Sequence, residues 1–245
     1  MTIEVVAFDA DDTLWHNETL YRAAQAKLQR LLAGDADAEA VAVRLYETEM
    51  ANLPTYGYGI KSFALSMIET AIELTAGRIS GQKIKEILGF AQEMLAADTE
   101  LLDHARETIV ELSGAYRLML VTKGDLRDQQ SKLARSGLSR YFDHVEIVSE
   151  KTTETYRDIL DRHSIAAQHF LMVGNSLRSD ILPVVALGAQ AVHIPHHVTW
   201  AHERVDGETL TEKDYHQLDR LDQLPDLIKR LNAARLNAGW PEAGR

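Results

Sequence analysis

Five short apolar runs constrain the fold of this chain more than any other feature of its sequence. They are rich in valine, isoleucine and leucine, and polar residues bound each of them. Within a run, apolar and polar residues do not alternate, which is typical of strands buried on both faces of a parallel sheet. The predicted strands span residues 3–8, 117–121, 145–148, 170–173 and 191–194.

Helical patterns lie between most of these runs, over residues 126–136, 153–163 and 177–187. Gly188 is placed to end the third helix, and Pro183 inside that pattern predicts a kink or a later start. Strands that alternate with helices are typical of an open α/β sheet. The sequence therefore predicts a doubly wound, mostly parallel α/β core.

The stretch from residue 16 to residue 100 breaks this alternation, because its patterns are helical only. Turn-forming residues interrupt it at 53–59. We therefore expect an α/β core made of residues 1–15 and 101–245, with an all-helical cap of residues 16–100 inserted after the first strand. The expected cap helices span residues 20–32, 38–52, 60–72 and 84–95.

Composition excludes several classes of function. The formal net charge of −11 argues against a protein that coats nucleic acid, since such proteins bind through a basic face. The chain has no cysteine, which excludes disulfides, thiolate zinc sites and a cysteine nucleophile. No segment approaches the roughly 20 apolar residues of a membrane span, and no basic leader precedes the first apolar run, so we expect a cytoplasmic protein.

Polar side chains follow the predicted strands where a parallel sheet places its site, at the carboxyl ends. Asp9 and Asp11 follow the first strand, Thr122 the second, Lys151 the third, and Asp180 comes soon after the fourth. Carboxylates gathered at one edge would repel each other, and a divalent cation relieves that repulsion. Because hard oxygen ligands favour magnesium over zinc, the sequence predicts a Mg²⁺ site.

This set of groups suits phosphoryl transfer. The Asp9 carboxylate can attack phosphorus and form an aspartyl-phosphate. Asp11, two residues on, can protonate the leaving oxygen and then deprotonate the water that cleaves the intermediate. A lysine and a hydroxyl can hold the non-bridging oxygens of the phosphoryl group.

The order Asp-x-Asp-x-Thr, then Thr, then Lys, then Gly-Asn-x-x-x-x-Asp resembles the haloacid dehalogenase superfamily over roughly residues 3–195. The resemblance implies that Asp9 is the nucleophile and Asp11 the acid/base. It also implies that Thr122 and Lys151 hold the phosphate. Its implied magnesium shell consists of Asp9, the Asp11 carbonyl, Asn175 and Asp180, partly through water.

Two positions bear on what the resemblance implies. Asn175 stands where the family more often has aspartate, so the shell carries one charge fewer and we expect weaker magnesium binding. The family's true dehalogenases lack a carboxylate at the position of Asp11, and its presence here favours phosphate chemistry over halide displacement.

Further substrate contacts are predicted at five positions. Thr13 and Lys123 lie beside the catalytic motifs, and Lys123 competes with Lys151 for the phosphate-holding role. Tyr56 and Tyr58 of the turn-rich break, with Lys61 just after it, are predicted to contact substrate when the cap closes. The alternative for this break is a surface turn with one packed tyrosine.

A histidine-rich tract at residues 193–202 admits two interpretations. One is a zinc site, and the other is a loop that follows the last strand near the site. The spacing of His196 and His202 favours the loop.

The sequence predicts a magnesium-dependent hydrolase of a small phosphate monoester, with a small phosphorylated metabolite as partner and neither nucleic acid nor membrane. The alternatives are a phosphomutase, a 2-haloacid dehalogenase, and a non-catalytic phosphoacceptor or binding module.

Overall fold

The computed structural model describes residues 2–196 and 215–238. Six strands of this part of the chain form one parallel sheet in the order β3-β2-β1-β4-β5-β6. The central strand is β1 (Val5–Phe8), which pairs with β2 (Arg117–Lys123) and β4 (Phe170–Gly174). The remaining strands are β3 (His144–Val148), β5 (Gln190–His193) and β6 (His216–Gln217).

Apolar clusters cover both faces of the sheet at its central strands, so β1 and β4 are buried along their whole length. Val6 and Phe8 of β1 face one apolar cluster, while Val5 and Ala7 face the other. The first cluster is closed by α5 (Ala105–Ser113), α6 (Leu126–Ser136) and α9 (Leu224–Ala238). The second is closed by α7 (Thr153–Arg162), the π-helical turn Leu177–Ile181 and α8 (Leu182–Val185). This confirms the predicted doubly wound α/β fold.

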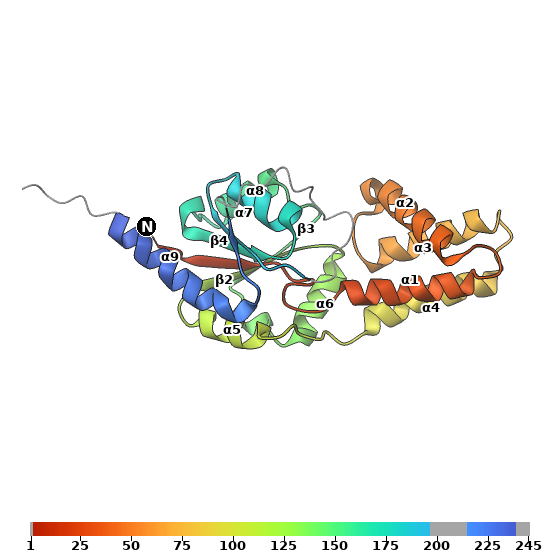
Figure 1. Cartoon of the computed structure of the whole chain (residues 1–245), viewed down its shortest axis with the longest axis horizontal. Coiled ribbons are helices and arrows are strands. Elements are labelled where there is room, and N and C mark those ends of the chain that lie inside the picture. Colours follow the sequence, from red (N-terminus) through yellow and green to blue (C-terminus); the bar gives the residue numbers. More distant parts are fainter. Residues whose placement is uncertain (1, 197–214, 239–245) are drawn as a thin grey trace, which may run out of the picture.

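Four helices between β1 and β2 form the predicted helical insertion. They are α1 (Glu18–Leu31), α2 (Ala38–Tyr56), α3 (Ile60–Leu74) and α4 (Gly81–Ala96). Residues from all four share an apolar cluster of their own, centred on side chains such as Leu28, Leu45, Met67 and Ile87. Figure 1 shows these helices at one end of an elongated molecule, next to α6. The limits of the two domains stay a prediction.

The structure departs from the expected element bounds at two prolines. α2 runs through Pro54 to Tyr56, so the first half of the expected break is helical; Pro54 lies in the last turn, where the loss of its N–H affects one hydrogen bond. The helix expected over residues 177–187 begins as a π-helical turn, and α8 starts only at Leu182 with Pro183 in its first turn, where proline fits. This confirms the later start that Pro183 predicted.

Two elements were not predicted. α5 is short, and it buries Ala105, Ile109 and Leu112 against the sheet at helical spacing. β6 consists of His216 and Gln217 alone, which is too short to leave a pattern in the sequence.

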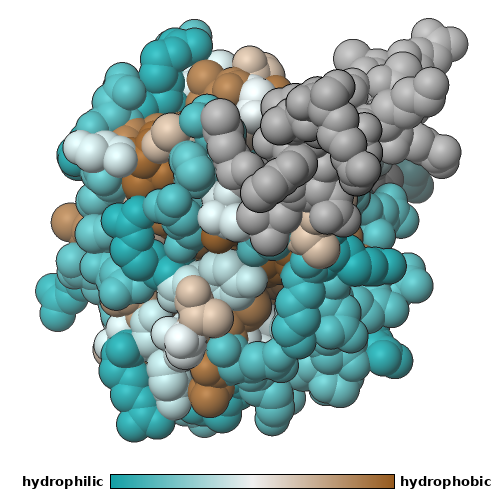
Figure 2. All heavy atoms as spheres, turned by 90° about the vertical axis from the view of Figure 1, so that its left-hand side faces the viewer, coloured by the Kyte–Doolittle hydropathy of each residue, from teal (hydrophilic) through white to brown (hydrophobic). Residues whose placement is uncertain are grey.

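None of the helices within the described ranges is long and apolar enough to cross a lipid bilayer. Figure 2 views the end of the molecule opposite α1 to α4 and shows hydrophobic side chains in several small patches among hydrophilic ones.

Candidate active site

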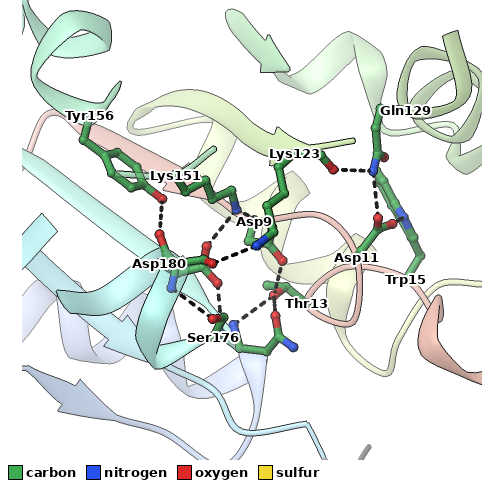
Figure 3. Close-up of polar contacts among 12 residues, drawn as sticks. Asp9, Asp11, Thr13, Trp15, Lys123, Gln129, Lys151, Tyr156, Ser176 and Asp180 are labelled. Atoms are coloured by element: carbon green, nitrogen blue, oxygen red, sulfur yellow. Dashed lines mark hydrogen bonds and ion pairs between the residues drawn. The ribbon is translucent and has the colours of Figure 1, made fainter. Parts of the chain in front are cut away.

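Lys151 lies between the carboxylates of Asp9 and Asp180 at the carboxyl edge of the sheet (Figure 3). Its Nζ is 2.5 Å from Asp9 Oδ1 and 2.7 Å from Asp180 Oδ1, and all three side chains are buried. The three groups come from separate parts of the chain, as the order of the strands requires. Negative side chains therefore converge on one point, with a cation beside them.

The turn after β1 fixes the direction of the Asp9 side chain. Asp12 adopts a positive φ of 59°, and its backbone N–H donates to the Trp15 carbonyl at 2.7 Å. This tight turn brings Thr13 back to the strand end, where its hydroxyl donates to Asp9 Oδ2 at 2.8 Å. The Asp12 carboxylate accepts from the backbone N–H groups of Asn17 and Glu18, and so caps α1, as its sequence context suggests.

Lys151 is held in place from its other side. The residue after it, Thr152, is the N-cap of α7 and accepts from the Thr155 N–H at 3.2 Å. Tyr156, one turn into α7, donates its hydroxyl to the Ser179 carbonyl at 3.1 Å. The start of α7 is therefore tied to the π-helical turn that carries Asp180.

Burial and the neighbouring opposite charge have opposing effects on the pKa values of Asp9 and Lys151. Burial raises the pKa of Asp9 to about 7, while the Lys151 ammonium acts in the opposite direction. Burial disfavours the Lys151 ammonium too, yet the charges of Asp180 and Asp9 outweigh it and raise the pKa of Lys151 well above its usual range. Lys151 therefore stays charged.

Asp11 points away from this group, toward α6 (Figure 3). Its Oδ1 accepts from the Trp15 indole N–H at 2.7 Å, and its Oδ2 accepts from Gln129 Nε2 at 2.7 Å. Lys132 Nζ lies 3.0 Å and 3.2 Å from the two oxygens. The predicted acid/base is thus an anchored carboxylate.

Thr122 and Lys123 form the carboxyl end of β2. Thr122 is buried, and both residues line a cavity that also contains Asp9 and Lys151. Lys123 Nζ donates to Ser179 Oγ at 3.0 Å and lies 4.2 Å from the centre of the Tyr58 ring. Lys151 contacts Asp9 directly, and which of the two lysines holds the phosphate stays a prediction.

The cap loop 57–59 and the start of α3 touch the core beside β2. Gly59 has a φ of 112°, and a Cβ there would lie 3.1 Å from the backbone nitrogen of Asp125. Lys61 Nζ donates to Asp125 Oδ2 at 2.9 Å. The loop therefore packs against the turn between β2 and α6, and glycine permits that close approach.

A cavity of about 180 Å³ lies between the sheet edge and the cap helices. Of the three cap residues predicted to contact substrate, Tyr58 lines it; Tyr56 is 52% exposed, and Lys61 is half exposed and paired with Asp125. Thr13 contacts Asp9 and Asn175, and it too is absent from the described residues that line the cavity. The contacts of all four with substrate stay predictions.

The cap end of the cavity is acidic. Glu18 of α1 and Glu49 of α2 line it together with Tyr21 and Gln25. Burial raises the pKa of Glu18 to about 7 and that of Glu49 to about 8. The negative charge of Asp12 adds to the rise for Glu18, and that of Glu18 adds to the rise for Glu49. Polar groups therefore face the part of a substrate that lies away from the sheet edge.

The side chains at the strand ends fit a magnesium ion by the chemistry of their donors. Asp9 and Asp180 offer carboxylate oxygens, and Asn175 offers an amide oxygen 3.2 Å from the Thr13 hydroxyl. Oxygen donors of this kind suit a hard cation. Within the described ranges no group of three or more His, Cys, Asp or Glu side chains is placed to hold a metal, so the set depends on Asn175 and on backbone oxygen.

The histidine-rich tract is described only as far as His196. His193 Nε2 is 3.0 Å from the Asn175 carbonyl, and His196 Nδ1 is 3.8 Å from Asp12 Oδ1. His197 and His202 lie outside the described residues. The described part of the tract, residues 193–196, lies beside the site.

Sequence reasoning missed Gln129, Lys132, Glu18 and Glu49. Gln129 and Lys132 are buried on α6. The available signal was a pair of polar residues three positions apart on the inner face of a predicted helix. That helix directly follows a strand that ends in one of the motifs.

The fold and this site define an α/β hydrolase with a helical insertion over the carboxyl edge of its sheet. The chain belongs to the haloacid dehalogenase-like hydrolase family, whose sequence model matches residues 3–188. This confirms the family that the motifs indicated.

Among solved structures, a haloacid dehalogenase-like family hydrolase from Xanthomonas campestris is similar at 36% identity, with a TM-score of 0.87 over 97% of this chain and 95% of that one. The HAD-hydrolase YfnB from Bacillus subtilis, bound to magnesium, shares the fold at 17% identity, with a TM-score of 0.65 over 93% and 99% of the two chains. Among curated proteins, the N-acylneuraminate-9-phosphatase of Mus musculus is 24% identical over 200 residues, which cover 77% of this chain and 81% of that protein.

Proposed function

We propose that this hydrolase is a magnesium-dependent phosphatase that acts on a small phosphate monoester through an aspartyl-phosphate. The observation that carries the proposal is the Asp9 carboxylate held beside Lys151, with a second carboxylate, Asp11, anchored at the cavity two residues on. A nucleophile, a counter-charge and an acid/base thus line one cavity.

In the first step, a carboxylate oxygen of Asp9 bonds to phosphorus as the ester P–O bond breaks, and Asp11 gives its proton to the departing alcohol oxygen. In the second step, Asp11 takes a proton from water as the water oxygen attacks phosphorus. Inorganic phosphate leaves, and the Asp9 carboxylate is restored.

Thr122 and Lys151 hold the non-bridging oxygens in both steps, since both line the cavity at the sheet edge. Magnesium, held by Asp9, the Asp11 carbonyl, Asn175 and Asp180, offsets the negative charge of the phosphoryl group when bound. The cap helices exclude water from the bound ester.

Two observations support a phosphate ester over a haloacid. A halide leaves without a proton, so an acid/base at Asp11 has no task in its displacement. The curated relative from mouse is named as a phosphatase of a phosphorylated acyl sugar. Together with Glu18, Gln25 and Glu49 at the cap end of the cavity, that name favours a hydroxyl-rich alcohol such as a sugar as the leaving group.

The test is a panel of phosphorylated metabolites with phosphate release as the readout, run with Mg²⁺ and with EDTA. We expect release from at least one monoester in Mg²⁺, none in EDTA, and none from Asp9→Asn. Asp37→Asn is the matched control, because Asp37 is an exposed N-cap of α2 and asparagine caps equally well.

Other results assign other activities. A phosphoryl group that moves within the substrate without release of phosphate indicates a mutase. Halide release from 2-chloropropionate indicates a dehalogenase. No turnover of any of these compounds contradicts the proposal and indicates a binding role.

A further inference from the structure

We propose that Lys132 of α6, assisted by Gln129, is a positioning residue that fixes the orientation of the Asp11 carboxylate beside the cavity. The inference rests on the proposed function, in which Asp11 is the acid/base. It adds two residues of α6, a helix that carries none of the motifs that define the family resemblance.

The contacts of Asp11 use both of its oxygens. Trp15 Nε1 donates to Oδ1 at 2.7 Å, Gln129 Nε2 donates to Oδ2 at 2.7 Å, and Lys132 Nζ reaches both at 3.0 Å and 3.2 Å. A carboxylate with donors on both oxygens is fixed in its rotation about χ1 and χ2. Asp11 therefore has one orientation in this structure, although its side chain is 21% exposed at the cavity.

Lys132 is itself fully engaged. Besides Asp11, its ammonium donates to Asn17 Oδ1 at 2.7 Å and lies 3.6 Å from Asp128 Oδ2. Its side chain is 7% exposed, so it is a buried cation whose hydrogen-bond donors all have acceptors. A buried, satisfied lysine is a rigid support, unlike a lysine on the surface.

The geometry gives this support a chemical consequence. Asp11, Gln129 and Lys132 all line the cavity that holds Asp9 and Lys151. Proton transfer to a leaving oxygen requires the carboxyl group within hydrogen-bond reach of it, and a small misplacement is costly. Lys132 also contacts Asn17, directly before α1, so it ties Asp11 to the start of the first cap helix.

A purely structural role is the alternative, in which Lys132 only balances Asp11 and Asp128. The two roles differ in how they respond to the leaving group. p-Nitrophenolate leaves with little need of a proton, whereas an alkyl alkoxide needs one. kcat/KM reports the steps up to and including the first irreversible one. For the nitrophenyl ester, kcat/KM is therefore insensitive to proton donation by Asp11.

The experiment compares Lys132→Met and Lys132→Arg with the wild-type protein on p-nitrophenyl phosphate and on the alkyl phosphate that the wild type hydrolyses fastest. We expect Lys132→Met to lose about 100-fold in kcat/KM on the alkyl ester and under about 5-fold on the nitrophenyl ester. Lys132→Arg keeps the charge and restores most of the loss. Equal losses on both esters overturn the proposal.

Lys83→Met is the matched control. Lys83 also pairs with an aspartate, Asp35 at 3.1 Å, but on the surface of the cap far from Asp11 in the fold. We expect both kcat/KM values of this variant to match the wild type.

A second measurement decides the matter without turnover. The indole N–H of Trp15 donates to Asp11 Oδ1, so its ¹H–¹⁵N resonance reports where that carboxylate lies. The resonance is assigned by its loss in Trp15→Phe. We expect it to shift in Lys132→Met and in Asp11→Asn, and to stay in place in Lys83→Met.

An unshifted resonance in folded Lys132→Met overturns the positioning role even if the protein is a phosphatase. A shifted resonance in a protein that hydrolyses no monoester upholds the positioning of Asp11 and refutes the proposed function. If Lys132→Met does not fold, Gln129→Leu takes its place in both measurements, since it removes one donor to Asp11 and leaves the ion pairs of Lys132 intact.

Discussion

The Asp180 carboxylate packs directly on the backbone of Gly174. A Cβ built at Gly174 would lie 2.2 Å from Asp180 Oδ2, which is far inside van der Waals contact. The same oxygen accepts from the Ser176 N–H at 3.0 Å, so it has no free space to move into. Glycine is therefore required at the end of β4 because any larger residue would clash with Asp180. Backbone conformation is not the reason, since the φ of Gly174 is not in the left-handed region.

Gly174→Ala is expected to displace Asp180 and, with it, Lys151. Because small misplacements of positioned groups are costly, we expect kcat/KM for the best monoester to fall by about 100-fold or more. Steady-state phosphate release measures this. Gly89→Ala in α4 is the control, since a Cβ at Gly89 meets nothing within 4 Å; a comparable loss in that variant would contradict the spatial explanation.

Asn175→Asp is expected to strengthen magnesium binding. The replacement adds a carboxylate to the donor set and keeps an oxygen where Asn175 Oδ1 meets the Thr13 hydroxyl. We expect the Mg²⁺ concentration for half-maximal activity to fall by about 3- to 10-fold. Magnesium titration of phosphate release measures it. An unchanged midpoint would show that residue 175 does not ligate the metal.

The stability of the protein is expected to depend on pH through Glu49. Burial raises the pKa of the Glu49 carboxyl from 4.5 to about 8 in the folded protein, so folding favours its neutral form. This contribution is complete below pH 4.5 and is lost as the pH rises through 8. Glu49→Gln should therefore lie within about 1 kcal/mol of the wild type near pH 5 and exceed its free energy of unfolding by about 4–5 kcal/mol at pH 9.

Urea denaturation at a series of pH values measures that difference. Glu47→Gln is the control, because Glu47 is an exposed neighbour on α2 that pairs with Arg44 at 3.2 Å. A constant difference between Glu49→Gln and the wild type across this range would refute the assignment to Glu49.

Tyr58→Ala is expected to weaken substrate binding more than Tyr56→Ala. The Tyr58 ring lies over Lys123 at the cavity, whereas the Tyr56 side chain is largely exposed. Loss of the ring should raise KM about 3-fold or more, since an exposed cation–π contact is worth about 0.5–1 kcal/mol. KM for the best monoester decides between the two tyrosines, and equal effects would contradict the different placement of their rings.

Much of the fold was predictable from local patterns. The apolar runs that became β1, β2 and β4 are largely buried on both faces, and such strands need no partner information to be recognised. The prolines shifted the bounds of α2 and α8, because proline is tolerated at helix ends in ways that depend on the neighbouring turn.

The part of the site predictable from the sequence is the part that follows from chain order. Asp9 and Asp180 each follow a buried strand, and parallel strands bring their carboxyl ends together, so their meeting at Lys151 was expected. The meeting of the strand ends follows from the path of the backbone, and the pattern of residue types along the chain is enough to predict that path.

Only the tertiary structure decided which polar side chains face the cavity. Tyr58 lines it from the loop between α2 and α3, whereas Tyr56 does not. Lys132 and Gln129 turn toward Asp11, because helix packing sets the rotation of α6 about its axis. Rotation by one residue, about 100°, exchanges a surface group for a buried one. That angle is set by contacts between residues distant in sequence, which local patterns do not contain.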